Sequence, residues 1–161
     1  MFKRILTTAI GALLALSIGA ASAYFTAQIK VPDSVIRAGS VAVSAEPTSA
    51  PLSIDSLAPG SSAARSLSVV NDGSLPVDVV VSPSKTAGIT AFYESLNCTV
   101  TTGNVPLYSG SFSQMKTQAL RMSPGARGDL RFEIGLPPES GNDLTEDYVK
   151  VSLYVDAEQA H

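Results

Sequence analysis

The sequence alternates apolar and polar residues over short stretches that are separated by turn-forming residues. Residues 130–134 and 149–155 each place apolar side chains at every second position. A period of two puts these side chains on one face of a β-strand. Helical patterning is limited to residues 89–96 and 111–120, which are too short to cover a sheet. The pattern predicts an all-β chain, an antiparallel jelly-roll-like β-sandwich with one or two short helical turns.

The strongest hairpin signal lies near the middle of the first half of the chain. Leu67 and Val69 alternate with serines, and Val77, Val79 and Val81 follow as the return strand. Between them, Asn71-Asp72-Gly73-Ser74 consists of residues that tolerate a positive φ. This arrangement predicts that the two strands pair as a β-hairpin.

The first residues have the three parts of a secretory signal peptide. Lys3 and Arg4 give a positive start, residues 5–18 are almost entirely apolar, and Ala21 and Ala23 form a small-x-small cleavage signal. The apolar run is too short for a stable membrane span. We therefore expect cleavage by a signal peptidase, a secreted protein found outside the cell or at its surface, and no membrane span in the mature chain.

An amphipathic strand follows the expected cleavage site directly. Alternate positions from residue 25 to residue 31 are apolar, and Pro32-Asp33-Ser34 then interrupts the strand. Such a strand either folds back onto its own domain or adds to the sheet edge of another molecule. If it is donated, the strand that drives polymerisation contains Tyr24, Phe25, Ala27, Ile29 and Val31.

Cleavage leaves 138 residues and takes the formal net charge from −3 to −5. A chain of this length forms one domain with a sizeable core. We expect a signal peptide at 1–23, a donor-like strand and linker at 24–37, and a jelly-roll domain at 38–161. The acidic balance and scattered basic residues argue against nucleic acid as a partner.

The sequence offers few groups for catalysis or metal binding. His161, the sole histidine, is the last residue, and no HExxH motif or phosphate-binding glycine loop is present. Cys98, the sole cysteine, falls on the apolar face of an alternating stretch, which predicts a buried thiol rather than an intermolecular disulfide. We expect no catalytic residue, no cofactor and no metal site.

Two weaker site hypotheses remain open. Asp143, Glu146 and Asp147 could supply oxygen ligands for Ca²⁺, but they lack a recognised ligand spacing, which favours a solvated acidic loop. A carbohydrate platform would need exposed rings, for which Tyr108, Tyr148 and Tyr154 are the candidates.

Several short motifs occur together in an order that resembles the TasA/camelysin family of exported bacterial proteins. Each motif is weak alone, but their common order covers most of the chain. The motifs are Ala23-Tyr24-Phe25-Thr26, Ala38-Gly39-Ser40-Val41-Ala42-Val43, Leu57-Ala58-Pro59-Gly60, Val70-Asn71-Asp72-Gly73-Ser74-Leu75, Pro106-Leu107-Tyr108-Ser109-Gly110-Ser111-Phe112, Ser123-Pro124-Gly125, Leu136-Pro137, Gly141-Asn142 and Val155-Asp156-Ala157-Glu158-Gln159.

The resemblance implies a jelly-roll fold, general secretory export and cleavage by a dedicated signal peptidase. It also implies extracellular fibres of a biofilm matrix, in which each copy donates its N-terminal strand to the next in a head-to-tail homopolymer, alongside other matrix components. The alternatives are a monomeric cell-surface or accessory protein, an adhesin-like module, and the metallo-endopeptidase that some relatives are labelled as.

The signal-peptide reading predicts where the mature protein begins. N-terminal sequencing of the secreted protein should start at Tyr24, or within about one residue of it, because Ala21 and Ala23 occupy the small-residue positions before the cut. Secreted or surface material that retains residues 5–18 would instead indicate a membrane anchor.

Overall fold

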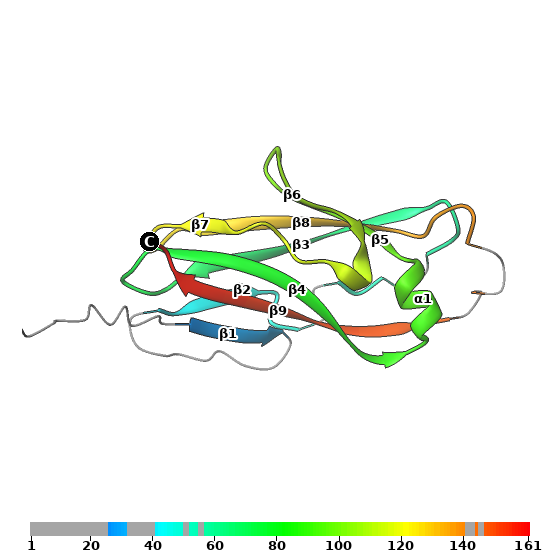
Figure 1. The fold of residues 1–161 in the computed structure, drawn as a ribbon, viewed down its shortest axis with the longest axis horizontal. Coiled ribbons are helices and arrows are strands. Elements are labelled where there is room, and N and C mark those ends of the chain that lie inside the picture. Colours follow the sequence, from blue (N-terminus) through cyan, green and yellow to red (C-terminus); the bar gives the residue numbers. More distant parts are fainter. Residues whose placement is uncertain (1–25, 32–40, 50–51, 55–56, 141–143, 145–146) are drawn as a thin grey trace, which may run out of the picture.

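The protein is a sandwich of two antiparallel β-sheets with one short α-helix (Figure 1). The computed structural model describes residues 26–31, 41–49, 52–54, 57–140, 144 and 147–161. The expected cleavage site, Tyr24, Phe25 and the linker at 32–37 lie outside these residues. No helix among the described residues is long and apolar enough to cross a membrane.

The strands and helical turns follow one another along the chain as β1 (Thr26–Val31), β2 (Val43–Glu46), β3 (Ser62–Asn71), β4 (Val77–Gly88), α1 (Thr90–Ser95), β5 (Asn97–Thr102), β6 (Val105–Ser111), η1 (Phe112–Gln114), β7 (Leu120–Met122), β8 (Arg127–Gly135) and β9 (Val149–Gln159). The short helices fall within the two segments that the sequence pattern marked. In Figure 1, α1 lies at one end of the sandwich and the C-terminus at the other.

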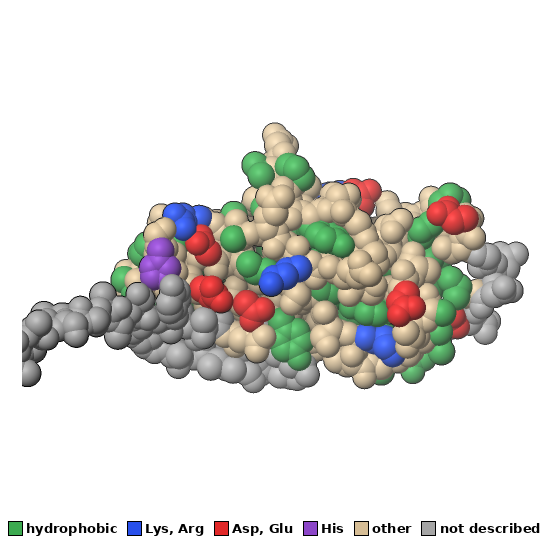
Figure 2. All heavy atoms as spheres, in the orientation of Figure 1, with side chains coloured by type: hydrophobic (Ala, Val, Ile, Leu, Met, Phe, Trp, Pro, Cys, Tyr) green, Lys and Arg blue, Asp and Glu red, His purple; other side chains and the backbone are tan. Residues whose placement is uncertain are grey.

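The strand order confirms the fold class expected from the sequence. One sheet has the order β1-β9-β4-β7, and the other has the order β2-β3-β8-β5-β6. With β2 set aside as an additional edge strand, the two sheets have the interleaved order of a jelly roll. The β5–β6 hairpin rises from the body of the molecule (Figures 1 and 2).

The core lies between the inner faces of the two sheets, where the alternating apolar residues meet. Leu67 and Val69 of β3 face inward beside Leu130 and Phe132 of β8, and Leu153 and Val155 of β9 cover them from the other sheet; all six are at most 2% exposed. Burial of one such side chain is worth about 1.5–3 kcal/mol. Since the part of the chain that the structure describes contains no disulfide, this packing is what holds the two sheets together.

The hairpin predicted at residues 67–81 is wrong, because its two strands belong to different sheets. The side chain of Asn71 is fully buried and donates hydrogen bonds to the carbonyls of Leu75 (2.8 Å) and Met122 (3.2 Å). Its Oδ1 also accepts a bond from the Gly73 backbone N–H (3.0 Å). Asn71 therefore stabilises a turn that crosses from β3 in one sheet to β4 in the other.

Candidate functional site

The N-terminal strand β1 lies at the edge of the four-stranded sheet and pairs with β9 of its own chain. The pairing is antiparallel and runs from Thr26 opposite Glu158 to Val31 opposite Leu153. Of the residues expected in the polymerisation strand, Ala27, Ile29 and Val31 fall within β1, and Tyr24 and Phe25 lie outside the described residues. Within one chain, β1 thus forms the outer edge of the domain's own sheet.

The register of this pairing matches the alternation of the strand. Ala27, Ile29 and Val31 stand opposite Ala157, Val155 and Leu153, each of which is at most 1% exposed. The intervening positions stand opposite Tyr154, Asp156 and Glu158, which are half-buried or exposed. A shift of one residue would place the apolar positions of β1 opposite the polar positions of β9, so the buried face of β9 fixes the register.

One side of the sandwich is closed by a strap between η1 and β7. The Thr117 backbone N–H donates to the Val81 carbonyl (3.1 Å), and the Val81 N–H donates to Thr117 Oγ1 (2.9 Å). The next residue, Gln118, donates its N–H to the carbonyl of Leu107 in β6 (2.9 Å). The strap therefore ties β4 of one sheet to β6 of the other, a role that no sequence pattern signalled.

The opposite side of the sandwich is closed differently. Here β1, at the edge of one sheet, neighbours β2, at the edge of the other (Figure 1). Without β1, the backbone edge of β9 from Leu153 to Glu158 would lose its strand partner. Unpaired edge groups of this kind are a template for another strand. The β9 edge is therefore the place where this fold could accept a strand from outside.

The β9 edge extends further than β1 covers. β4 pairs with β9 from Val149 to Gln159, whereas β1 pairs only with Leu153–Glu158. Residues 149–152 on that edge have no partner among the described strands, and Tyr148 beside them is 57% exposed. A strand supplied by another molecule would therefore find additional backbone positions on β9.

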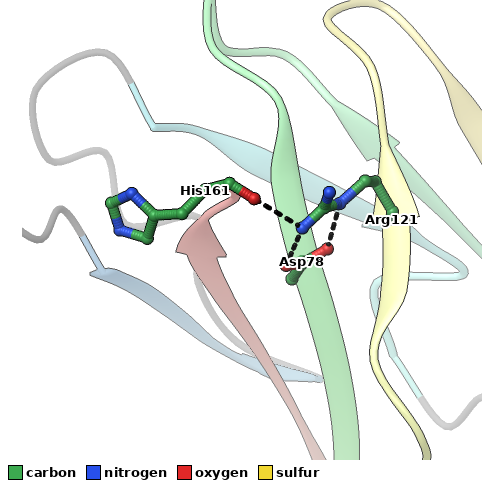
Figure 3. Close-up of polar contacts among 3 residues, drawn as sticks. All are labelled: Asp78, Arg121 and His161. Atoms are coloured by element: carbon green, nitrogen blue, oxygen red, sulfur yellow. Dashed lines mark hydrogen bonds and ion pairs between the residues drawn. The ribbon is translucent and has the colours of Figure 1, made fainter.

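The described residues do not fit a metal centre. No three His, Cys, Asp or Glu side chains among them lie close enough to hold a metal ion. The His161 carbonyl accepts a hydrogen bond from Arg121 Nη2 (3.3 Å). The same guanidinium donates two hydrogen bonds, of 2.8 and 2.9 Å, to the Asp78 carboxylate (Figure 3). This end of the molecule is an ion-pair cluster, and the donor set of a zinc protease is not assembled there.

Arg121 also sets the titration of Asp78. The hydrogen bonds from Arg121 hold the pKa of the Asp78 carboxyl below its usual value, outweighing the opposite effect of burial. The ion pair stabilises the fold above the unfolded-state pKa of the carboxyl, and this contribution is lost as the pH falls through the lowered folded-state pKa. Because the Arg121 side chain is 61% exposed, solvent screens the ion pair and its contribution is small.

The two weaker site hypotheses receive no support from the geometry. Of the acidic group suggested for Ca²⁺, Asp147 is described, while Asp143 and Glu146 lie outside the described residues. The tyrosines suggested for carbohydrate binding lie on separate elements: Tyr108 in β6, Tyr154 in β9 and Tyr148 before β9. The Tyr108 hydroxyl donates to the Ser111 carbonyl (2.7 Å), which holds that ring to its own strand.

Figure 2 shows Asp and Glu side chains interspersed with Lys and Arg over the visible face of β4 and β9. That face has no continuous basic patch.

The family model described as "Camelysin metallo-endopeptidase" matches residues 1–91. The match covers more than half of the chain and includes β1, β2, β3 and β4. The resemblance inferred from the sequence motifs is therefore confirmed. No curated protein matches the chain.

Cys98 is buried, as its position on an alternating strand predicts. The residue is 2% exposed, its Sγ lies 3.8 Å from Met115 Sδ, and burial raises the pKa of the thiol to about 12. At neutral pH the thiol is therefore protonated, and a thiolate is the form that attacks disulfides and binds metals.

Replacing this thiol tests its structural role. Cys98→Ser should lower the free energy of unfolding by about 1–2 kcal/mol, measured by urea denaturation, because it buries a hydroxyl in place of a thiol. Assembly should be unchanged under non-reducing conditions. A thiol reagent should label native Cys98 far more slowly than a control cysteine in Ser109→Cys, an exposed site on β6. Loss of oligomers with unchanged stability would instead identify an intermolecular disulfide.

Proposed function

This chain belongs to the camelysin metallo-endopeptidase family. We propose that it is a secreted structural subunit of extracellular fibres. Each copy places its N-terminal strand on the β9 edge of the next, in a head-to-tail homopolymer. Proteins of this family are typically secreted, which agrees with the signal peptide expected at 1–23. A signal peptidase and other components of a biofilm matrix are the further partners in this proposal.

The observation that supports the proposal most directly is the position of β1. It is an edge strand, it comes first among the described elements, and it is the strand that pairs with the β9 edge. Antiparallel pairing in another molecule would use the same register and the same backbone hydrogen bonds as pairing within one chain. Exchange between chains therefore sacrifices no hydrogen bond.

The geometry of such an exchange produces a filament. The donor, β1, and the acceptor, the β9 edge, are different surfaces of one molecule. A contact between unlike surfaces does not close on itself unless its rotation forms a ring, so each added copy presents a new free acceptor or donor. This property is what a matrix fibre requires.

Pairing within one chain competes with pairing between chains. A short connection gives β1 an effective concentration of about millimolar at its own β9 edge. Pairing between chains must therefore include favourable contacts that pairing within one chain lacks. In the register that places Val31 opposite Leu153, positions 149–152 of β9 fall opposite residues 32–35, so additional pairing there requires the segment that follows β1 to extend along β9.

Deletion of residues 24–31 tests this mechanism. The truncated protein should remain a folded monomer with sheets of five and three strands, because the deletion leaves the buried core of β3, β8 and β9 in place. It should not elongate into fibres under the electron microscope. A synthetic peptide of residues 24–31 should cap the growth of full-length protein by occupying β9.

A point substitution tests whether elongation requires the apolar face of β1 while the strand itself is retained. The alternation predicts that Ile29 faces the core, so Ile29→Asp should block elongation by placing an unpaired carboxylate there. Gln28→Lys is the control, since Gln28 is exposed and stands opposite Asp156, so a positive charge there should be tolerated. If the deletion unfolds the monomer, or if Ile29→Asp assembles normally, donation between chains is wrong.

The pairing of β1 within its own chain supports one alternative, a monomeric cell-surface or accessory protein of the same fold. In that case β1 completes its own sheet permanently. Size-exclusion chromatography of the mature protein separates the two proposals, because a monomer would elute at a single position at every concentration.

The family description favours a second alternative, a metallo-endopeptidase. We propose that this chain is not a peptidase, because the described donors do not assemble into a zinc site. Purified mature protein should contain zinc at well below one atom per chain and should not cleave casein. Stoichiometric zinc together with proteolysis that a chelator abolishes would show that the chain is a metallopeptidase.

A further inference from the structure

The outer face of the five-stranded sheet has a row of charges that alternate in sign. Arg127, Asp129, Arg131 and Glu133 project from alternate positions of β8, and all four are exposed. Successive members of this β8 charge row are separated by about 6.7 Å along the strand. The row contains two positive and two negative side chains, so a uniformly charged ligand would gain nothing from it.

Small side chains flank the β8 charge row on both sides. On β3, Ser68, Ser66 and Ala64 stand opposite Asp129, Arg131 and Glu133. On β5, Thr101 and Thr99 stand opposite Arg131 and Glu133. The long arginine and glutamate side chains therefore rise above a low, hydroxyl-lined surface on which the side chains of an opposing sheet could lie.

The charges of the row are only partly paired within the chain. Arg127 Nε lies 3.2 Å from Asp129 Oδ1, and Ser68 and Ser62 donate hydrogen bonds to Asp129 and Glu133. Arg131 and Glu133 form no ion pair with the residues that the structure describes. These two side chains keep the capacity to pair with charges from another molecule.

We propose that this face is a self-association surface, on which the β8 charge row pairs with the same row of a second copy lying antiparallel to it. This arrangement has a two-fold axis that lies in the contact plane, perpendicular to β8, and passes between Asp129 and Arg131. The axis places β8 of the second copy over β8 of the first in the opposite direction. Arg127 then meets Glu133 of the second copy, and Asp129 meets Arg131. All four pairs that the symmetry generates are of opposite charge.

The same row excludes the other simple arrangement. If the two strands ran parallel, each residue would meet its own copy, and like charges would face each other at every position. Like-charge contacts disfavour a wrong partner or register. The alternation therefore selects the antiparallel orientation of a second copy.

The size of the face indicates a weak contact. Five strands spaced about 4.8 Å apart and about six residues long cover about 500 Å² on each copy. Stable protein–protein contacts bury about 800 Å² on each partner. A single pair should therefore dissociate readily, and the contact would become stable where many copies are arrayed, as along neighbouring fibres.

A charge-swap experiment tests this contact. Self-association is measured by sedimentation equilibrium in excess peptide of residues 24–31, which blocks any association through β1. The wild-type protein should associate more weakly at about 0.5 M than at about 0.05 M salt. Arg131→Glu alone and Asp129→Arg alone should each raise the dissociation constant about tenfold or more. An equimolar mixture of the two variants should associate as the wild type does, because all facing charges are again opposite.

The controls address folding and surface charge in general. Lys116→Glu changes the charge of an exposed residue in the strap and should leave self-association unchanged. Circular dichroism checks that each variant folds, and if Asp129→Arg does not fold, Arg127→Glu and Glu133→Arg form the equivalent pair. A wild-type protein that stays monomeric up to about millimolar concentration would refute the proposal. Failure of the mixture to restore association would also refute it, whatever the result of the β1 experiments.

Discussion

The proposed elongation depends on the backbone edge of β9 between Leu153 and Glu158. The inner side chains of this segment, Leu153, Val155 and Ala157, belong to the core, so the strand cannot leave the sheet without exposing it. Its other edge is permanently paired with β4. The outer edge is therefore open to a strand, which either its own chain or another chain could supply.

The two sides of the sandwich are closed by elements of different kinds. The strap closes one side through Thr117 and Gln118, which form hydrogen bonds with β4 and β6, respectively. The other side depends on β1, an edge strand held by β9 alone within its sheet. This asymmetry gives the fold one permanent side and one side that could be completed by a neighbour. The β8 charge row lies on a separate face, so lateral contact and elongation need not compete.

The sequence predicts the strands well and their partners less well. Period-two alternation identifies the inward faces of β3, β8 and β9 because one face of each must be buried. The same alternation cannot tell whether consecutive strands belong to one sheet. The predicted hairpin is instead a connection between the two sheets, and the hydrogen bonds of Asn71 to the carbonyls of Leu75 and Met122 stabilise it. Thr117 was missed because its partner, Val81, is brought near only by the complete fold. The N-terminal strand was identifiable by pattern, but the chain with which it pairs was not, since pairing within and between chains uses identical bonds.

The most direct test of donation is a disulfide placed across the β1–β9 pair. Gln28 stands opposite Asp156 in the register, at a separation that suits a disulfide, and buried Cys98 does not compete. Chains with Gln28→Cys alone and chains with Asp156→Cys alone are mixed, assembled and oxidised. Donation between chains predicts a disulfide-linked dimer containing one chain of each kind. The absence of this dimer, together with efficient cross-linking when both cysteines are in one chain, would show that β1 never leaves its own domain.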